Sequence, residues 1–218
     1  MTGPLLTLSG VRRFDRPGAD GRDGTPSGGK ALSVVDLRLD PGELVALTGP
    51  SGSGKSTVLM VAGGWAVPDR GTVTVHPPLP PVDVRELSWR HLAFVPQSLG
   101  LLDELTLAEN ITLGLPARER GGNEAVSRVL DALNLREPAH RPAARTSRGE
   151  QQRAALGRAL VGGAALLLAD EPTSHQDRRR ADLVCAALRR AAEAGTGVLV
   201  ATHDPLVVAH ADREIALT

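Results

Sequence analysis

Apolar residues recur with two different periods along the chain. Short apolar runs typical of strands occupy 5–11, 31–39, 43–48, 72–75, 92–95, 165–169 and 197–201. Residues 31–39 alternate as in a half-buried strand, whereas 165–169 and 197–201 are continuously apolar, as in strands covered on both faces. Residues 15–30 are rich in Gly, Pro and Asp and are typical of an exposed loop. The pattern therefore predicts a largely parallel sheet flanked by helices.

Helical spacing interrupts the strand pattern. The segments with this spacing are 55–62, 123–134, 149–161 and 178–194. Between about residues 98 and 162 no strong strand pattern remains. We therefore expect a strand-and-helix core made of residues 1–97 and 163–218, and an inserted helical subdomain at 98–162.

Composition narrows the classes of protein. The 218 residues are 41% hydrophobic, but no run approaches the roughly 20 apolar residues of a membrane span. The N-terminus lacks the charged-then-apolar order of a signal peptide. Cys185 is the single cysteine, which argues against a disulfide framework. A net charge of zero and few aromatic residues argue against a nucleic-acid partner.

Lysine is almost absent, yet one lysine stands in a phosphate-binding pattern. Only Lys30 and Lys55 are lysines among 25 basic residues. Residues 49–56, Gly-Pro-Ser-Gly-Ser-Gly-Lys-Ser, match G-x-x-x-x-G-K-[ST] between an expected strand and an expected helix. Glycines allow backbone N–H groups to approach phosphates, Lys55 supplies a compact charge to the β- and γ-phosphates, and the Ser56 hydroxyl is suited to Mg²⁺. The expected nucleotide contacts from this loop are Gly49, Ser51, Gly52, Ser53, Gly54, Lys55, Ser56 and Thr57.

An acidic pair follows the apolar strand at 165–169. Asp170 and Glu171 would lie at the carboxyl edge of a parallel sheet, where open α/β folds bind ligands. We predict that Asp170 holds Mg²⁺ and that Glu171 orients and deprotonates the attacking water. A solvated turn is the alternative, and the preceding phosphate-binding pattern favours the functional interpretation.

Three further features are uninformative singly. Gln97 and His203 each follow an expected strand, and 146–153 begins an expected helix. Taken in order with the phosphate-binding loop and the acidic pair, they resemble the ABC ATPase family over almost the whole chain. The P-loop is at 49–56, the Q-loop glutamine is Gln97, the signature is 146–150, the D-loop is 174–177 and the switch histidine is His203.

The resemblance implies an α/β P-loop NTPase fold with a mostly parallel sheet, an N-terminal antiparallel β portion and an inserted helical subdomain. It also implies two cassettes packed head to tail around ATP and Mg²⁺. Ser147 and Gly149 would hold the γ-phosphate bound by the partner cassette, and His203 would contact the γ-phosphate and water. Gln97 would touch Mg²⁺. Phe14 would stack on adenine, with plain core packing as its alternative.

The resemblance further implies partners. Stretches 34–57 and 101–115 are similar to the cassettes of lipoprotein-release, macrolide-export and peptide-export systems. They imply an ATPase at the cytoplasmic face of the membrane that drives a separate permease, in export or extraction. A regulatory ATP-dependent clamp on a membrane partner is the alternative. A soluble ABC protein of translation or DNA repair fits less well, because such proteins carry two cassettes or a long coiled coil.

The signature departs from the family's usual Leu-Ser-Gly-Gly-Gln. Residues 146–150 are Thr-Ser-Arg-Gly-Glu, so Arg148 replaces a glycine and Glu150 a neutral amide. The D-loop's usual small–Leu pair is His175-Gln176. We expect hydrolysis to survive while dimer-dependent stimulation changes. The alternative is a mixed dimer with a second cassette whose signature is intact.

Overall fold

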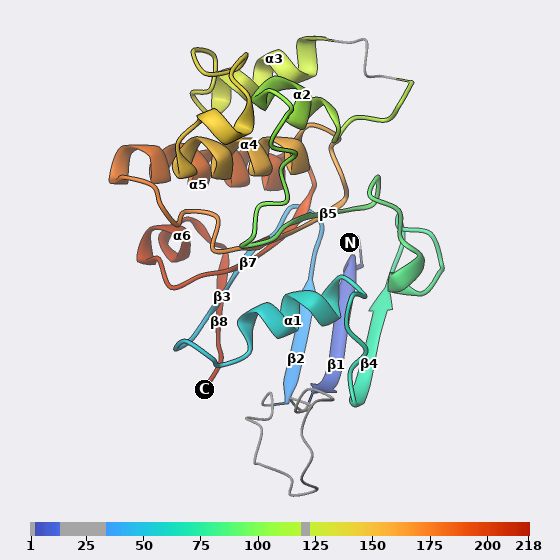
Figure 1. Ribbon diagram of the computed structural model, residues 1–218. Coiled ribbons are helices and arrows are strands. Elements are labelled where there is room, and N and C mark those ends of the chain that lie inside the picture. Colours follow the sequence, from blue (N-terminus) through green and yellow to red (C-terminus); the bar gives the residue numbers. More distant parts are fainter. Residues whose placement is uncertain (1–2, 14–33, 119–122) are drawn as a thin grey trace, which may run out of the picture.

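The computed structural model describes residues 3–13, 34–118 and 123–218, which form two sheets and a group of helices (Figure 1). The strands are β1 Leu6–Arg12, β2 Val35–Leu39, β3 Leu44–Thr48, β4 Arg70–Val75, β5 Leu92–Val95, β6 Leu166–Asp170, β7 Gly197–Ala201 and β8 Arg213–Ala216. The helices are α1 Lys55–Ala62, α2 Leu107–Thr112, α3 Asn123–Ala132, α4 Arg148–Leu160, α5 Arg178–Glu193 and α6 Pro205–His210, with 3₁₀ turns η1 Val84–Glu86 and η2 Ala143–Arg145.

The central sheet is parallel, with strand order β5-β6-β7-β3-β8. Every residue of β6 and β7 is buried. Because successive side chains of a strand point to opposite faces, alternate residues of these strands enter two different cores. Leu167 and Val198 belong to one core, and Leu168 and Leu199 to the other.

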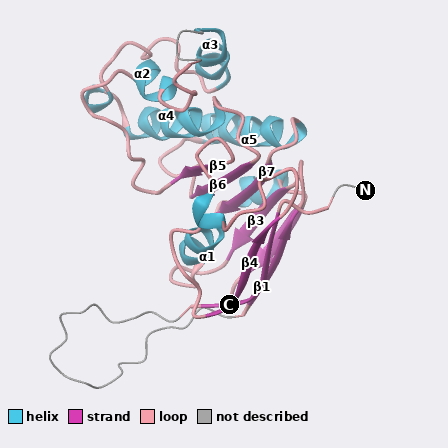
Figure 2. Cartoon of the chain, turned by 90° about the vertical axis from the view of Figure 1, so that its right-hand side faces the viewer, coloured by secondary structure: helices cyan, strands magenta, loops and turns pink. Residues whose placement is uncertain are grey.

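The two cores are covered by different layers. Helices α2, α3, α4 and α5 lie on one side of the parallel sheet, and α1 lies on the other with the antiparallel sheet β2-β1-β4 beyond it (Figures 1 and 2). Continuous burial of the central strands follows from this double covering. Parallel strands also place all their carboxyl ends at one edge, where the loops after β3, β5, β6 and β7 gather.

The structure confirms the expected fold class, including the parallel sheet and the N-terminal antiparallel portion. The expected strand at 31–39 begins at Val35 within the described residues, and 15–30 lies outside them. No helix among the described residues is long and apolar enough to cross a bilayer.

The sequence pattern did not predict three elements: α2, α6 and β8. Helices α2 and α6 have six residues each, too few for a clear period, and are set by their caps at Thr106 and Asp204. Strand β8 is an edge strand with mostly exposed residues, so it lacks the apolar signal of the central strands.

Candidate functional site

The phosphate-binding loop joins β3 to α1 in a backbone conformation that only glycine adopts easily. Gly49, Gly52 and Gly54 have φ of 142°, 78° and 95°. A Cβ on Gly49 would lie 2.5 Å from the Leu217 carbonyl oxygen and 2.7 Å from Ser53 Oγ. Gly54 then caps α1 in the left-handed region, so the helix begins directly at Lys55.

Lys55 folds back over this loop. Its Nζ donates hydrogen bonds to the carbonyl oxygens of Gly49 at 2.8 Å and Pro50 at 3.1 Å. Ser51, Gly52 and Ser56 are exposed, and Thr57 is half-buried. The loop thus presents an ammonium group and accessible backbone at the start of a helix, which is an arrangement suited to phosphate.

Asp170 ends β6 close to this loop. Its residue is 6% exposed, and burial raises the pKa of its carboxyl, opposed by a hydrogen bond with the Ser56 side chain. Repulsion from Glu171 also raises this pKa, while attraction from Lys55 lowers it. These four side chains therefore occupy one electrostatic site at the sheet edge.

Glu171 follows β6 with a positive φ of 49°, a strained conformation for a residue with a Cβ. Asp170 pairs with Ala201 across the ladder, so Glu171 lies beside the residues after β7. His203 Nδ1 is 2.8 Å from Glu171 Oε1, and the Thr202 hydroxyl donates to Oε2 at 3.4 Å. The structure therefore brings Glu171 and His203 together from segments 32 residues apart in the sequence.

Gln97 lies two residues beyond β5, at the same edge of the sheet. Val95 pairs with Ala169, and the Gln97 side chain is exposed. Arg158 of α4 donates to the carbonyl oxygens of Leu99 and Gly100 at 2.9 and 2.6 Å and so fixes the loop that follows Gln97. Phe14, the expected adenine-stacking residue, lies outside the described residues.

The signature segment, residues 146–150, forms the N-terminus of α4. Ser147 is the N-cap: its Oγ accepts from the Glu150 N–H, and Glu150 Oε2 accepts from both the N–H and the Oγ of Ser147 at 2.7 Å. Burial alone would raise the pKa of Glu150, but these Ser147 hydrogen bonds outweigh it and lower that pKa. Glu150 is therefore a carboxylate that already occupies both donors of Ser147.

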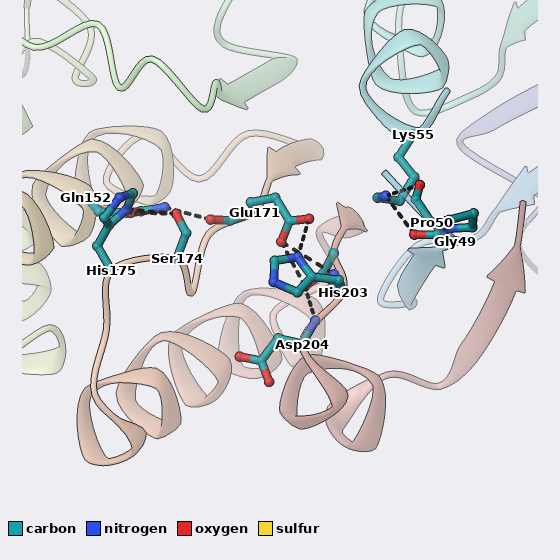
Figure 3. A network of polar contacts seen from close by, with 10 residues as sticks. Gly49, Pro50, Lys55, Gln152, Glu171, Ser174, His175, His203 and Asp204 are labelled. Atoms are coloured by element: carbon teal, nitrogen blue, oxygen red, sulfur yellow. Dashed lines mark hydrogen bonds and ion pairs between the residues drawn. The ribbon is translucent and has the colours of Figure 1, made fainter. Parts of the chain in front are cut away.

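A buried glutamine joins α4 to the acidic edge. Gln152, 1% exposed, donates through Nε2 to the Glu171 carbonyl oxygen at 2.6 Å and accepts from the Ser174 hydroxyl at 3.0 Å. In Figure 3, Glu171 lies between the Gln152–Ser174–His175 group and His203, with Lys55 and the loop carbonyls beyond. Chemically, the edge offers a cation, a buried carboxylate and a second carboxylate held by an imidazole.

Sequence reasoning missed Gln152 and Arg153. Both are buried, and Arg153 donates through Nε to the Leu133 carbonyl oxygen at 2.9 Å. The sequence signal for them was a pair of long polar residues directly before Ala154 and Ala155 in an expected helix. Helical spacing alone does not reveal it, because residues 152–157 are all buried and the helix therefore has no clear polar stripe there.

A family profile described as "ABC transporter" matches residues 32–174. The chain is 38% identical over its full length to the macrolide export ATP-binding/permease protein MacB of Burkholderia pseudomallei, but it spans only 33% of that protein. It is 36% identical to the lipoprotein-releasing system ATP-binding protein LolD of Hyphomonas neptunium, of which 96% is covered.

Solved structures of similar shape are ATP-binding cassettes. One is a dimeric post-hydrolysis state of a cassette bound to ADP and Pi, with a TM-score of 0.80 and 28% identity over 98% of this chain and 94% of that one. A dimeric bacterial ABC transporter cassette gives a TM-score of 0.77 at 28% identity and the same coverage.

Proposed function

Because the chain belongs to the ABC transporter family and is one of its ATP-binding, ATP-hydrolysing cassettes, we propose that it hydrolyses MgATP at a head-to-tail dimer interface and drives a separate membrane permease. The observation that carries the proposal is the Glu171–His203 contact at the sheet edge beside the phosphate-binding loop. A carboxylate positioned by an imidazole, next to a phosphate cradle, is suited to orienting and deprotonating a water.

In this proposal the phosphate-binding loop holds the nucleotide in one protomer. Lys55 exchanges the two carbonyl oxygens that it contacts for phosphate oxygens, and the backbone N–H groups of residues 49–57, Pro50 excepted, contact the phosphates. Ser53 supports this role, because its buried Oγ has no hydrogen-bond partner within the described residues. A buried hydroxyl without a partner indicates a place for a ligand group.

The residues at the edge also fit Mg²⁺. The Ser56 hydroxyl and the Asp170 carboxylate are hydrogen-bonded to each other, and they are oxygen donors of the kind Mg²⁺ takes together with substrate phosphates. Burial raises the pKa of Asp170, and a cation beside it would favour the ionised form. We propose Ser56, Asp170 and the Gln97 amide oxygen as its protein ligands. Bound there, the ion would neutralise charge on the β- and γ-phosphates.

In the reaction, Glu171 accepts the proton of the attacking water, and the His203 contact fixes the direction of its carboxylate. Glu171 is held from the other side through its main chain by Gln152. The base is thus positioned before nucleotide binds, which lowers the cost of organising it in the transition state.

The second half of each ATP site would come from the partner cassette. Ser147 and Gly149 lie at the N-terminus of α4 and would face the γ-phosphate bound by the other protomer. Residues 98–162, which carry this segment, would act as a helical subdomain on the core of residues 1–97 and 163–218. Phe14 stays a candidate for adenine stacking.

A permease would contact the groove of about 280 Å³ between β5 and α4. Its lining includes Trp65 and Trp89, which are 47% and 48% exposed, and Arg158, which holds the loop after Gln97. Large exposed aromatic residues beside a groove favour a protein partner. The likeness to MacB and LolD supports export or extraction, with the cassette peripheral on the cytoplasmic face.

A regulatory clamp is the second candidate, and the Glu150–Ser147 contact favours it. Because Glu150 already accepts from both donors of Ser147, ATP-driven closure of a homodimer must displace a carboxylate from the phosphate-facing end of α4. A cassette that closes weakly by itself would depend on a membrane partner or on a second cassette with an intact signature.

The test compares ATP hydrolysis by the wild type and Glu171→Gln, with light scattering on both. We expect turnover in the wild type, a loss of about 10³-fold in the variant, and an ATP-dependent dimer of the variant. Co-purification with a polytopic permease and faster turnover in its presence would support transport coupling. ATP binding without hydrolysis or dimerisation in either protein would refute the homodimeric motor.

A further inference from the structure

Two helices begin side by side around one pocket. Helix α4 starts at its N-cap Ser147 and α5 at its N-cap Asp177, and both caps line a pocket of about 400 Å³. The loop 171–177 runs from Glu171 to the start of α5. The phosphate-facing end of α4 and the loop that carries the proposed base therefore meet at this pocket.

Gln176, in the loop 171–177, contacts α4 with both ends of its amide. Its Nε2 donates to the Gly149 carbonyl oxygen at 2.9 Å, and its Oε1 accepts from Arg153 Nη1 at 2.7 Å. Arg153 is 3% exposed and donates its Nε to the Leu133 carbonyl oxygen. Because this guanidinium is fixed at its other edge, it holds the Gln176 amide in the orientation that reaches Gly149.

The backbones also approach closely at this point. A Cβ on Gly149 would lie 2.9 Å from the His175 carbonyl oxygen. His175 itself has a φ of 60°, in the left-handed region that is unfavourable for a side chain. The loop is therefore pressed against the first turn of α4 in a conformation that surrounding contacts must maintain.

A second set of hydrogen bonds also joins α4 to the loop 171–177. Gln152 contacts the Glu171 carbonyl oxygen and the Ser174 hydroxyl, one turn of α4 beyond Gly149. Two glutamines, one from each segment, thus connect the first turns of α4 to the loop 171–177.

We propose that Gln176 is a positioning residue that couples the Ser147–Gly149 end of α4 to the Glu171 loop, so that the two move as one body. This inference rests on the proposed function, in which Ser147 and Gly149 serve the partner's ATP while Glu171 serves the chain's own. Through Gln176, closure on one ATP of a dimer constrains the base that acts on the other.

Glutamine suits this position because it donates and accepts at once. A Met at 176 has a similar length and does neither. A Glu at 176 still accepts from Arg153 but cannot donate to the Gly149 carbonyl oxygen. Arg153 lies one turn further along α4 than Gly149, so the pair Gln176→Met and Gln176→Glu separates the contact with the first turn of α4 from the contact with the buried guanidinium.

The first experiment is hydrogen–deuterium exchange on the isolated, nucleotide-free chain, followed in peptides covering 147–153. We expect exchange at least about tenfold faster in both variants than in the wild type, because the first turn of α4 opens more often. Thermal unfolding of Gln176→Glu should stay close to the wild type, since Arg153 keeps its acceptor. Exchange in Gln176→Glu equal to that of the wild type would overturn the proposal.

The second experiment measures ATP-dependent dimerisation by light scattering, with each variant in a Glu171→Gln background. Both Gln176 variants should dimerise about tenfold more weakly, while their ATP affinity as monomers stays within about twofold of the parent. Equal weakening in the uncharged Met and the charged Glu excludes simple repulsion from phosphate. If Gln176 had a merely structural role, Gln176→Met would lower the unfolding temperature, and Gln176→Glu would match the wild-type exchange rate and the parent's dimerisation.

The two proposals fail differently. If the parent protein neither binds ATP nor dimerises, the proposed function fails, and the exchange comparison still decides whether Gln176 fixes α4. If the parent dimerises and the Gln176 variants do so equally well, the coupling fails and the proposed function stands.

Discussion

The nucleotide-facing edge and the signature end of α4 differ in what their polar groups do before any ligand arrives. At the nucleotide edge, Lys55 rests on two loop carbonyls and Ser56 on Asp170, so each contact involves a group that a phosphate or a cation replaces directly. At the signature end, the Ser147 donors are held by a carboxylate of the same turn.

This difference has a physical consequence. Replacing a carbonyl by a phosphate oxygen strengthens the contact made by Lys55, because both partners are then charged. Replacing the Glu150 carboxylate by a phosphate brings two anions together and removes the capping interactions of α4. In the proposed function, the nucleotide edge can therefore bind its ligand without further rearrangement, whereas Glu150 at the signature end opposes closure of the dimer.

After the loss expected for Glu171→Gln, the largest expected effect is also on turnover at the nucleotide edge. His203→Ala removes the Nδ1 contact that directs the Glu171 carboxylate, and we expect hydrolysis to fall about 100-fold, with a much smaller fall in ATP affinity from the loss of the expected γ-phosphate contact. Steady-state ATPase assays and calorimetric ATP binding measure the two quantities. His210→Ala on α6 is the matched control, because the His210 Nδ1 hydrogen-bonds to the Leu206 main-chain carbonyl oxygen at 2.9 Å, within its own helix. Wild-type turnover in His203→Ala would break the assignment.

The next largest effect distinguishes the nucleotide edge from the signature end by what each contributes to the ATP affinity of the monomer. Lys55→Arg replaces a compact charge by a planar fork in a tight loop, and we expect monomer affinity to fall about 10- to 100-fold. Ser147→Ala should leave monomer affinity unchanged, because the signature segment would serve the partner's nucleotide. Calorimetry on dilute protein makes both measurements. Equal losses of monomer ATP affinity in the two variants would mean that the nucleotide edge and the signature end do not bind ATP in different protomers.

A smaller effect is expected in the opposite direction at the signature end. Glu150→Gln removes the negative charge but keeps an acceptor for the capping box, so ATP-dependent dimerisation should tighten about tenfold, or ~1.4 kcal/mol. Light scattering in a Glu171→Gln background measures it.

Glu109 provides the control for this change. It forms the same capping box with Thr106 at the start of α2, so Glu109→Gln alters an equivalent contact away from the signature. If Glu109→Gln tightened the dimer as much as Glu150→Gln, the effect would not come from repulsion at the phosphate-facing end.

The smallest effect concerns stability. Burial raises the pKa of Asp170 in the folded state. The free energy of unfolding therefore falls as pH rises from about 4, where the carboxyl ionises in the unfolded chain, to the raised pKa of the folded state. Asp170→Asn should therefore raise the free energy of unfolding of the nucleotide-free protein at neutral pH by about 1 kcal/mol. Urea unfolding should show this gain shrinking as pH falls through the raised pKa, and lost at pH below about 4, where the carboxyl is protonated in both the folded and the unfolded state.

Asp212→Asn should do the reverse. Although burial alone raises the pKa of Asp212, hydrogen bonds from the Leu44 N–H and from Arg189 outweigh it and lower that pKa. Its ionised form therefore stabilises the fold above pH about 4, and that stability is lost as pH falls through the lowered pKa. A gain in stability from Asp212→Asn would contradict this.

The sequence by itself determined the family and the order of most strands and helices along the chain. The apolar strands at 165–169 and 197–201 and the glycine spacing at 49–54 are local patterns, and each reports burial or backbone geometry that a few neighbouring residues impose. The short helices α2 and α6 were not predicted, because their caps, rather than a helical period of apolar residues, specify them.

Only the tertiary structure decided which polar residues act on one another. The Glu171–His203 contact and the two glutamine ties join segments 19 to 32 residues apart, and no local pattern encodes them. Their partners are chosen by strand register and by the packing of α4 on the loop 171–177, which are long-range consequences of burying apolar faces. The residues were therefore visible in the sequence, whereas their pairing required the fold.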